Sequence, residues 1–162
     1  MIQSLNGKKV LVLVSNGVDE KAVSIVQRDL LKAGATIKTV GTEPGLINSW
    51  NGKDWGIYFA VDTQISAILG SDFDMMVVPS GERSVAKLSV NPHCERIVSS
   101  FVSIQKPVCL MGNAVELLDK TGNSAAAEWV MSGDCSGDVE SFVAKMVEYF
   151  AGSAETELKI AA

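Results

Sequence analysis

The apolar residues of the chain gather in short continuous runs. Three of them, at 10–14, 75–78 and 108–111, contain no polar side chain. A strand that is apolar at every position is buried on both faces, which is typical of a parallel sheet with helices on both sides. The segment 35–40 is expected to form another strand of this sheet, and 125–131 is expected to be a further strand.

Between these runs, apolar residues recur at the spacing of amphipathic helices. Gly34 suits the C-terminal end of the first helix, and Asn91 before Pro92 is typical of an N-cap followed by proline at the first helical position. Strands that alternate with helices predict an α/β fold, a flavodoxin-like three-layer α/β/α sandwich with a mainly parallel sheet. The predicted helices cover 20–33, 64–69, 92–101, 114–118 and 138–150.

The segment 41–62 is rich in Gly, Asn and Trp and differs from the rest. Asn51-Gly52, between the apolar stretches 47–50 and 57–59, predicts a β-hairpin. Its aromatic residues either pack on the core or form a contact surface, since Trp and Tyr are enriched at interfaces. We expect the second, and therefore a homo-oligomer, a dimer or higher.

Composition and charge exclude several classes of function. The 162 residues fit one domain over 1–152 with a flexible C-terminal tail over 153–162. With 14 Lys and Arg against 19 Asp and Glu, a net charge of -5 argues against nucleic acid. No apolar run is long enough to cross a membrane, and no signal peptide is evident. Three widely spaced cysteines without a CxxC pair fit a reducing cytoplasm.

No metal and no cofactor is expected. The single histidine, His93, excludes a metal cluster built on several histidines. The turn after the first strand matches neither the dinucleotide nor the P-loop pattern and carries acids where a phosphate would lie. Ligands of open α/β sheets bind beyond the carboxyl ends of the strands, which directs attention to the turns at 15–20, 79–83 and 111–114.

These turns resemble those of the ThiJ/PfpI superfamily, which has the class I glutamine amidotransferase-like fold. A Val-rich strand at 10–14 precedes Asn-Gly-Val-Asp-Glu at 16–20. Residues 74–81 are similar to the family's Asp-x-Val-Val-x-Pro-Gly-Gly, and 106–115 to its Gly-Lys-Pro-Val-Ala-x-Ile-Cys-His-Gly-Pro. Ala-Glu-Trp-Val at 127–130 also fits. The resemblance covers roughly residues 8–150.

The chain differs from the family at the positions that correspond to the family's catalytic residues. Gly112 aligns with the nucleophilic cysteine at the sharp strand-to-helix turn, the elbow, and Asn113 aligns with the following histidine. The family's glutamate falls near Asp19 or at Ala22. A glycine at the elbow is most similar to the C-terminal domain of large-subunit catalases, which has no catalytic cysteine. A glycine there also relieves backbone strain.

The resemblance therefore implies a non-catalytic domain that acts in binding or assembly, in a stress-related or catalase-related context. The alternative is an unconventional hydrolase or glyoxalase of the same superfamily that does not use the elbow cysteine. Cys109 is expected to be a buried strand residue, Cys94 to lie away from the elbow, and Cys135 to be the most exposed of the three. No partner for any of these thiols is evident.

We expect a shallow elbow pocket that holds a small anion. The N–H groups of Asn113 and Ala114 at a helix N-terminus favour an anion, and Gly112 lets a ligand approach the backbone. In the alternative reading, a side chain such as Met111, Val115 or Glu116 fills the space. The residues expected to bind are Asn16, Gly17, Asp19, Ser80, Gly81, Gly112 and Asn113.

Overall fold

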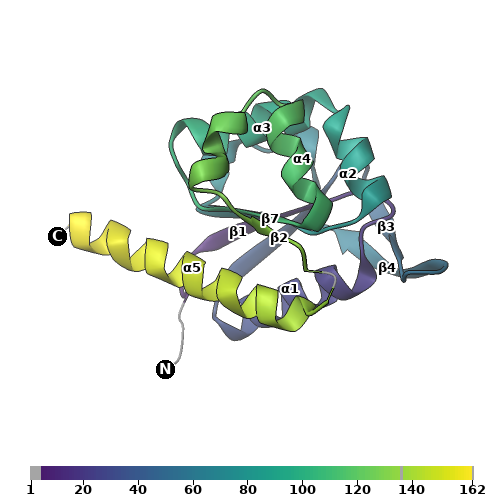
Figure 1. Cartoon of the computed structure of the whole chain (residues 1–162), viewed down its shortest axis with the longest axis horizontal. Coiled ribbons are helices and arrows are strands. Elements are labelled where there is room, and N and C mark those ends of the chain that lie inside the picture. The colour runs from purple at the N-terminus through teal and green to yellow at the C-terminus, as the bar shows by residue number, and fades with distance from the viewer. Residues whose placement is uncertain (1–4, 136, 162) are drawn as a thin grey trace.

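A computed structural model describes residues 5–135 and 137–161, with 153–161 as backbone only. Six parallel strands form the central sheet in the order β5-β2-β1-β6-β7-β8. This is the flavodoxin-like arrangement (Figure 1). The strands are β1 (Lys9–Val14), β2 (Thr36–Gly41), β5 (Thr63–Gln64), β6 (Met75–Val78), β7 (Val108–Met111) and β8 (Met131–Gly133).

Helices cover both faces of the sheet (Figure 1). On one side lie α1 (Glu20–Lys32) and α5 (Val139–Ala161), and on the other lie α2 (Glu82–Ser89), α3 (Pro92–Ser103) and α4 (Glu116–Lys120). Short 3-10 turns complete the chain at η1 (Ile65–Ala67), η2 (Gly70–Asp72), η3 (Gly112–Val115) and η4 (Ser124–Glu128).

The alternation of side chains along β1 explains why this strand must be apolar throughout. Val10, Val12 and Val14 belong to the core under α1 and α5, whereas Leu11 and Leu13 belong to the core under α2, α3 and α4. All five are fully buried. Burial of one such side chain contributes about 1.5–3 kcal/mol, so both cores depend on this central strand.

A separate two-stranded antiparallel sheet is formed by β3 (Gly45–Trp50) and β4 (Trp55–Val61), as the hairpin pattern predicted. One face of the hairpin buries Ile47 and Phe59 in the core. Backbone hydrogen bonds fasten it to the turn after β1: Gly17 N donates to Asn48 O at 2.8 Å and Trp50 N to Val18 O at 2.8 Å. The hairpin is therefore held beside the carboxyl end of the sheet.

The predicted strands at 10–14, 35–40, 75–78 and 108–111 are confirmed. The strand predicted over 125–131 is wrong, because Ala126 O accepts from both Trp129 N and Val130 N and closes a 3-10 turn; the strand begins only at Met131. The helix predicted over 64–69 is only the three-residue turn η1, and α2 was not anticipated.

The last helix also differs from expectation. The helical backbone of α5 continues to Ala161, well past the predicted end at residue 150. Asp138 caps its start, because Asp138 Oδ1 accepts from Ser141 N at 3.0 Å. Among the described residues, no helix is both long and apolar enough to cross a membrane.

Candidate functional site

The turns after β1, β6 and β7 lie together at the carboxyl end of the sheet. Asp19 N donates to Ser80 O at 2.9 Å, which joins the first turn to the second. Gly81 N donates to the side-chain Oδ1 of Asn113 at 3.0 Å, which joins the second turn to the third. A Cβ on Gly81 would lie 2.7 Å from Val18 Cα, so only glycine permits this approach.

Gly112 stands at the elbow, directly after β7, with φ +54°, in the left-handed region that favours glycine. A Cβ built on it would lie 3.0 Å from Ser80 Cβ and 3.9 Å from both Ser80 Oγ and Cys135 Sγ. The turn continues as η3 and then as α4, a helix of only five residues. The elbow therefore presents bare backbone, and a helix this short supplies little dipole for an anion.

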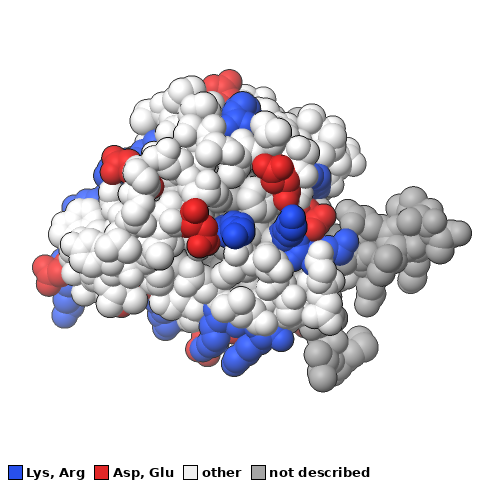
Figure 2. All heavy atoms as spheres, turned by 180° about the vertical axis from the view of Figure 1, so that it is seen from behind, with Lys and Arg blue, Asp and Glu red and all other residues white. Residues whose placement is uncertain are grey.

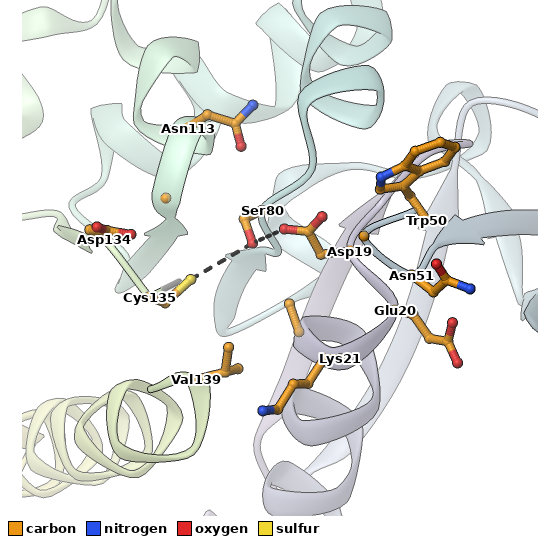
Figure 3. Close-up of a pocket in the computed structure, with 13 residues that line it drawn as sticks. Asp19, Glu20, Lys21, Trp50, Asn51, Ser80, Asn113, Asp134, Cys135 and Val139 are labelled. Carbon is orange, nitrogen blue, oxygen red and sulfur yellow. Dashed lines mark hydrogen bonds between the residues drawn. The ribbon is translucent and has the colours of Figure 1, made fainter. Parts of the chain in front are cut away.

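A cavity of about 380 Å³ opens beside Gly112 (Figure 3). Of the residues expected to bind, Asp19, Ser80, Gly112 and Asn113 line it. Apart from Glu20, in the turn at 15–20, and Ala22, one of the two positions considered for the family's glutamate, the sequence did not point to the other walls. These walls come from α1, the hairpin, the turn after β8 and the start of α5. These further lining residues are Glu20, Lys21, Ala22, Trp50, Asn51, Gly52, Asp134, Cys135 and Val139.

Both positions considered for the family's glutamate, Asp19 and Ala22, lie in this cavity wall. The side chains considered as plugs do not line it: Met111 is buried in the core, and Val115 and Glu116 are exposed. The cavity beside the elbow is therefore open.

A second cavity, of about 440 Å³, adjoins the first and shares Asp19, Trp50, Gly52 and Asn113 with it. Gly17 and Gly81, both expected at the site, line this second space. Asn16 lines neither cavity. Its Oδ1 accepts from Asn48 N at 2.7 Å and supports the hairpin.

The charge of the elbow cavity is mainly negative. Asp19, Glu20 and Asp134 line it against a single cation, Lys21 (Figure 3). An anion would meet three carboxylates there, which disfavours the small anion expected beside Gly112. A neutral polar molecule suits these walls better.

Cys135 is the most exposed of the three cysteines, as predicted, but it is nevertheless buried, with 4% of its surface exposed against 0% for Cys94 and Cys109. Packing against the start of α5 and the hydrophobic core draws this segment inward. Its Sγ lies 3.7 Å from Ser80 Oγ, whose own proton is directed to Asp19 Oδ2 at 2.7 Å. The neutral thiol is thus the donor in this pair, whereas a thiolate at Cys135 would accept a hydrogen bond from the Ser80 hydroxyl.

Burial raises the pKa of the Cys135 thiol, and the carboxylates of Asp19 and Asp134 raise it further, against the opposing effect of the Ser80 hydrogen bond. The thiol is consequently protonated near neutrality. A catalytic thiolate requires an environment that lowers the pKa, and this environment does the reverse.

The other two cysteines lie outside both cavities. Burial raises the pKa of Cys94 to about 12, and it raises the pKa of Cys109 as well, as expected for cysteines in apolar surroundings. His93, beside Cys94 on α3, has its Nδ1 3.4 Å from the Arg96 guanidinium. Among the described residues, no group of three His, Cys, Asp or Glu side chains could hold a metal ion.

Comparisons with known proteins agree with this fold. A sequence profile of the DJ-1/PfpI family matches residues 8–150. Protein DJ-1 homolog D of Arabidopsis thaliana is 25% identical over 127 residues, which are 71% of this chain and 32% of that protein. The chain thus spans about a third of the length of this relative.

Solved structures share the fold at low sequence identity. Oxidized DJ-1 of Toxoplasma gondii superposes with a TM-score of 0.76 at 16% identity, covering 93% of this chain and 95% of that one. DJ-1beta of Drosophila melanogaster gives a TM-score of 0.76 at 19% identity, covering 90% and 91%. A similarity to the C-terminal domain of catalases is not among these findings.

Proposed function

The chain belongs to the DJ-1/PfpI family, and we propose that it is a non-catalytic member that binds a small molecule in the elbow cavity. One observation carries the proposal: Gly112, without a side chain, stands at the elbow beside an open cavity of about 380 Å³. The thiol in the cavity wall, Cys135, is held protonated by burial and by neighbouring carboxylates, which raise its pKa. Binding without covalent chemistry fits both facts.

The occupant that suits the walls is small, polar and uncharged. Asn113 and Asn51 offer amide N–H donors, since their Oδ1 atoms already accept backbone hydrogen bonds. Val139 and the ring of Trp50 add apolar surface. A cavity of this volume lies within the usual range for ligand sites.

The test combines a binding measurement with an activity measurement. Glycerol, acetamide and acetone are titrated into ¹⁵N-labelled protein, and we expect saturable shifts of the Gly112, Asn113 and Cys135 amides from at least one of them. Ala22→Leu, which adds bulk to the cavity wall, should abolish those shifts, whereas Ala86→Leu on the exposed side of α2 should leave them unchanged. No shift at the elbow from any probe would contradict the proposal.

The alternative is an unconventional enzyme of the same superfamily, and Cys135 is the residue that favours it, because it is the thiol nearest the elbow. We expect no consumption of methylglyoxal above that of a buffer blank. Consumption that disappears in Cys135→Ser and survives in Cys94→Ser would establish the enzyme instead.

Self-association is a second proposed function, favoured by the outer surface of the hairpin. Leu46 and Tyr58, on the face opposite Ile47 and Phe59, are 61% and 62% exposed. Figure 2 shows a wide area without charged side chains on the side that carries β3 and β4. Large exposed apolar patches mark contact sites. Sedimentation velocity should show a dimer or higher oligomer that Tyr58→Glu dissociates, with Tyr149→Phe as the control. A native protein that is monomeric at all concentrations would oppose this.

The proposed setting is a stress-related, cytoplasmic one, and the similarity of the elbow to the catalase C-terminal domain belongs to the same proposal. Leu-Met-Gly-Asn-Ala at 110–114 supports it. An immunoblot of the native source should reveal whether the chain occurs alone or as part of a larger protein. A band of catalase size would support the catalase relation, and a band near 17.2 kDa would oppose it.

A further inference from the structure

The second cavity contains a cation held by aromatic rings. The guanidinium carbon of Arg83, on α2, lies 4.2 Å from the centroid of the Trp50 ring and 5.4 Å from that of Trp55. The two indoles stand edge to face, with centroids 5.6 Å apart and planes at 90°. Such stacking fixes the orientation of the planar guanidinium and covers one of its faces with the rings.

The hydrogen-bonding edge of this guanidinium remains available. Within the part of the chain that the structure describes, Arg83 makes no ion pair. An arginine in the first turn of a helix is electrostatically unfavourable. The position of the Arg83 side chain is therefore stabilised by the indole rings and by packing of its aliphatic part. That aliphatic part packs directly over Gly17, where a Cβ would overlap Arg83 Cβ.

The same cavity also contains carboxylates. Glu82 and Glu116 line it together with Arg83, and Asp19 lies at the boundary with the elbow cavity. A ligand that carried only a carboxylate would be attracted by Arg83 but repelled by the three acids. A ligand that carried only an ammonium group would leave the guanidinium without a partner.

We propose that the second cavity binds an amino-acid-like zwitterion, with its carboxylate on the Arg83 guanidinium and its ammonium group among the carboxylates of Glu82 and Glu116. A guanidinium binds a carboxylate through two parallel hydrogen bonds, and the acids in the same cavity supply the opposite charge. The inference does not require that the elbow cavity be occupied.

Three probes of similar size test the charge pattern. L-alanine carries both groups, propionate lacks the ammonium, and ethylamine lacks the carboxylate. In ¹H–¹⁵N spectra of the native protein, L-alanine should shift the Arg83 Nε–H and the Trp50 indole N–H resonances saturably, and the other two probes should bind at least about tenfold more weakly. Equal binding of L-alanine and propionate, or no binding of L-alanine, would overturn the proposal.

Variants separate a ligand role of Arg83 from a purely structural one. Arg83→Gln should abolish binding of L-alanine and Arg83→Lys should weaken it, while Lys87→Gln, exposed on the same helix, should bind like the native protein. Glu116→Gln should reduce the preference for L-alanine over propionate. If Arg83→Gln alters the indole resonances of the free protein yet binds L-alanine normally, Arg83 serves only to clamp the hairpin.

The outcome is independent of the elbow proposal, because the readouts differ. Neutral probes report at Gly112 and Cys135, which do not line the second cavity, whereas L-alanine reports at Arg83, which does not line the elbow cavity. If the probes shift one set of resonances and leave the other unchanged, the unchanged set identifies the proposal that has failed.

Discussion

Ser80 Oγ donates a 2.7 Å hydrogen bond to Asp19 Oδ2, so that the turn after β6 is fastened to the start of α1. The two residues are 61 positions apart in the chain. Their backbones are also joined, through Asp19 N and Ser80 O at 2.9 Å. The family resemblance placed Ser80 at one of two glycine positions, and the structure gives its hydroxyl a definite role. It holds the carboxylate of Asp19 in the cavity wall and turns its own oxygen toward Cys135.

Replacing Ser80 by Ala should lower the free energy of unfolding by about 1–3 kcal/mol, the cost of removing a hydrogen bond to a charged, partly buried group. Urea denaturation followed by circular dichroism measures it. Ser103→Ala removes an exposed hydrogen bond to the Ser100 carbonyl oxygen and serves as the control, with a smaller loss. Equal losses in the two variants would mean that the Ser80–Asp19 bond adds nothing.

The same two residues also affect the reactivity of Cys135. Asp19 raises the pKa of the Cys135 thiol and the Ser80 hydrogen bond lowers it, so Asp19→Asn should increase the thiolate fraction at a fixed pH and Ser80→Ala should decrease it. Alkylation by iodoacetamide at Cys135, followed by peptide mass spectrometry between pH 7 and 9, should therefore be faster in Asp19→Asn and slower in Ser80→Ala than in the native protein.

Asp54→Asn, in the exposed turn of the hairpin, is the control for a change of net charge. It should leave the alkylation rate at Cys135 unchanged. In the native protein the rate should rise with pH beyond the ordinary cysteine pKa of about 8.5, because the folded protein holds the thiol in its neutral form. A rate that is already at its plateau at pH 7 would contradict the raised pKa.

The sheet could be predicted from the sequence because its strands are apolar at every position. Val10 to Val14 are buried on both faces, as expected of a largely β-branched run in a central parallel strand. Helix α2 was not predicted because Val85 and Leu88 are the only apolar residues on its inner face. With eight residues, the helix has about two turns, too few for the apolar spacing to repeat. Local sequence could not reveal that Ala126 would accept two backbone hydrogen bonds and end the predicted strand.

The candidate site was predictable only in part, for the same kind of reason. Turns that follow parallel strands meet at one edge of the sheet, so Asp19, Ser80 and Gly112 could be grouped from their positions in the chain. Trp50 and Cys135 reach the cavity through contacts between distant elements, the hairpin and the start of α5. The Gly-rich surroundings of Cys135 suggested an exposed loop, and burial against α5 became evident only in three dimensions.

Gly112→Ala should destabilise the protein more than Gly122→Ala. Both glycines have positive φ, +54° and +75°, which costs a residue with a Cβ about 1–2 kcal/mol. At Gly122 the added methyl group would enter open space, whereas at Gly112 it would lie 3.0 Å from Ser80 Cβ. Chemical denaturation should show the difference. Equal losses would indicate that the elbow can relax away from Ser80.

The last prediction concerns Gly17, whose substitution should dislodge Arg83 from the indole rings. Gly17 and Gly45 have nearly the same φ, +93° and +92°, so an alanine pays the same backbone strain at either position. An added Cβ at Gly45 would meet nothing within 4 Å. At Gly17 it would overlap Arg83 Cβ, an atom fixed to the backbone of α2 that cannot rotate away.

Gly17→Ala therefore forces the turn after β1 away from α2, and overpacking of this kind costs about 1–3 kcal/mol beyond the strain. Near-ultraviolet circular dichroism and indole fluorescence should change in Gly17→Ala and stay native in Gly45→Ala, because the Trp50 and Trp55 rings lose the guanidinium stacked on them. L-alanine binding should be lost with the spectral change, since the cavity needs Arg83 in place. Gly17→Ala with native spectra and a native stability would show that the turn and α2 are not in firm contact, and the orientation of Arg83 would then have to come from the two rings alone.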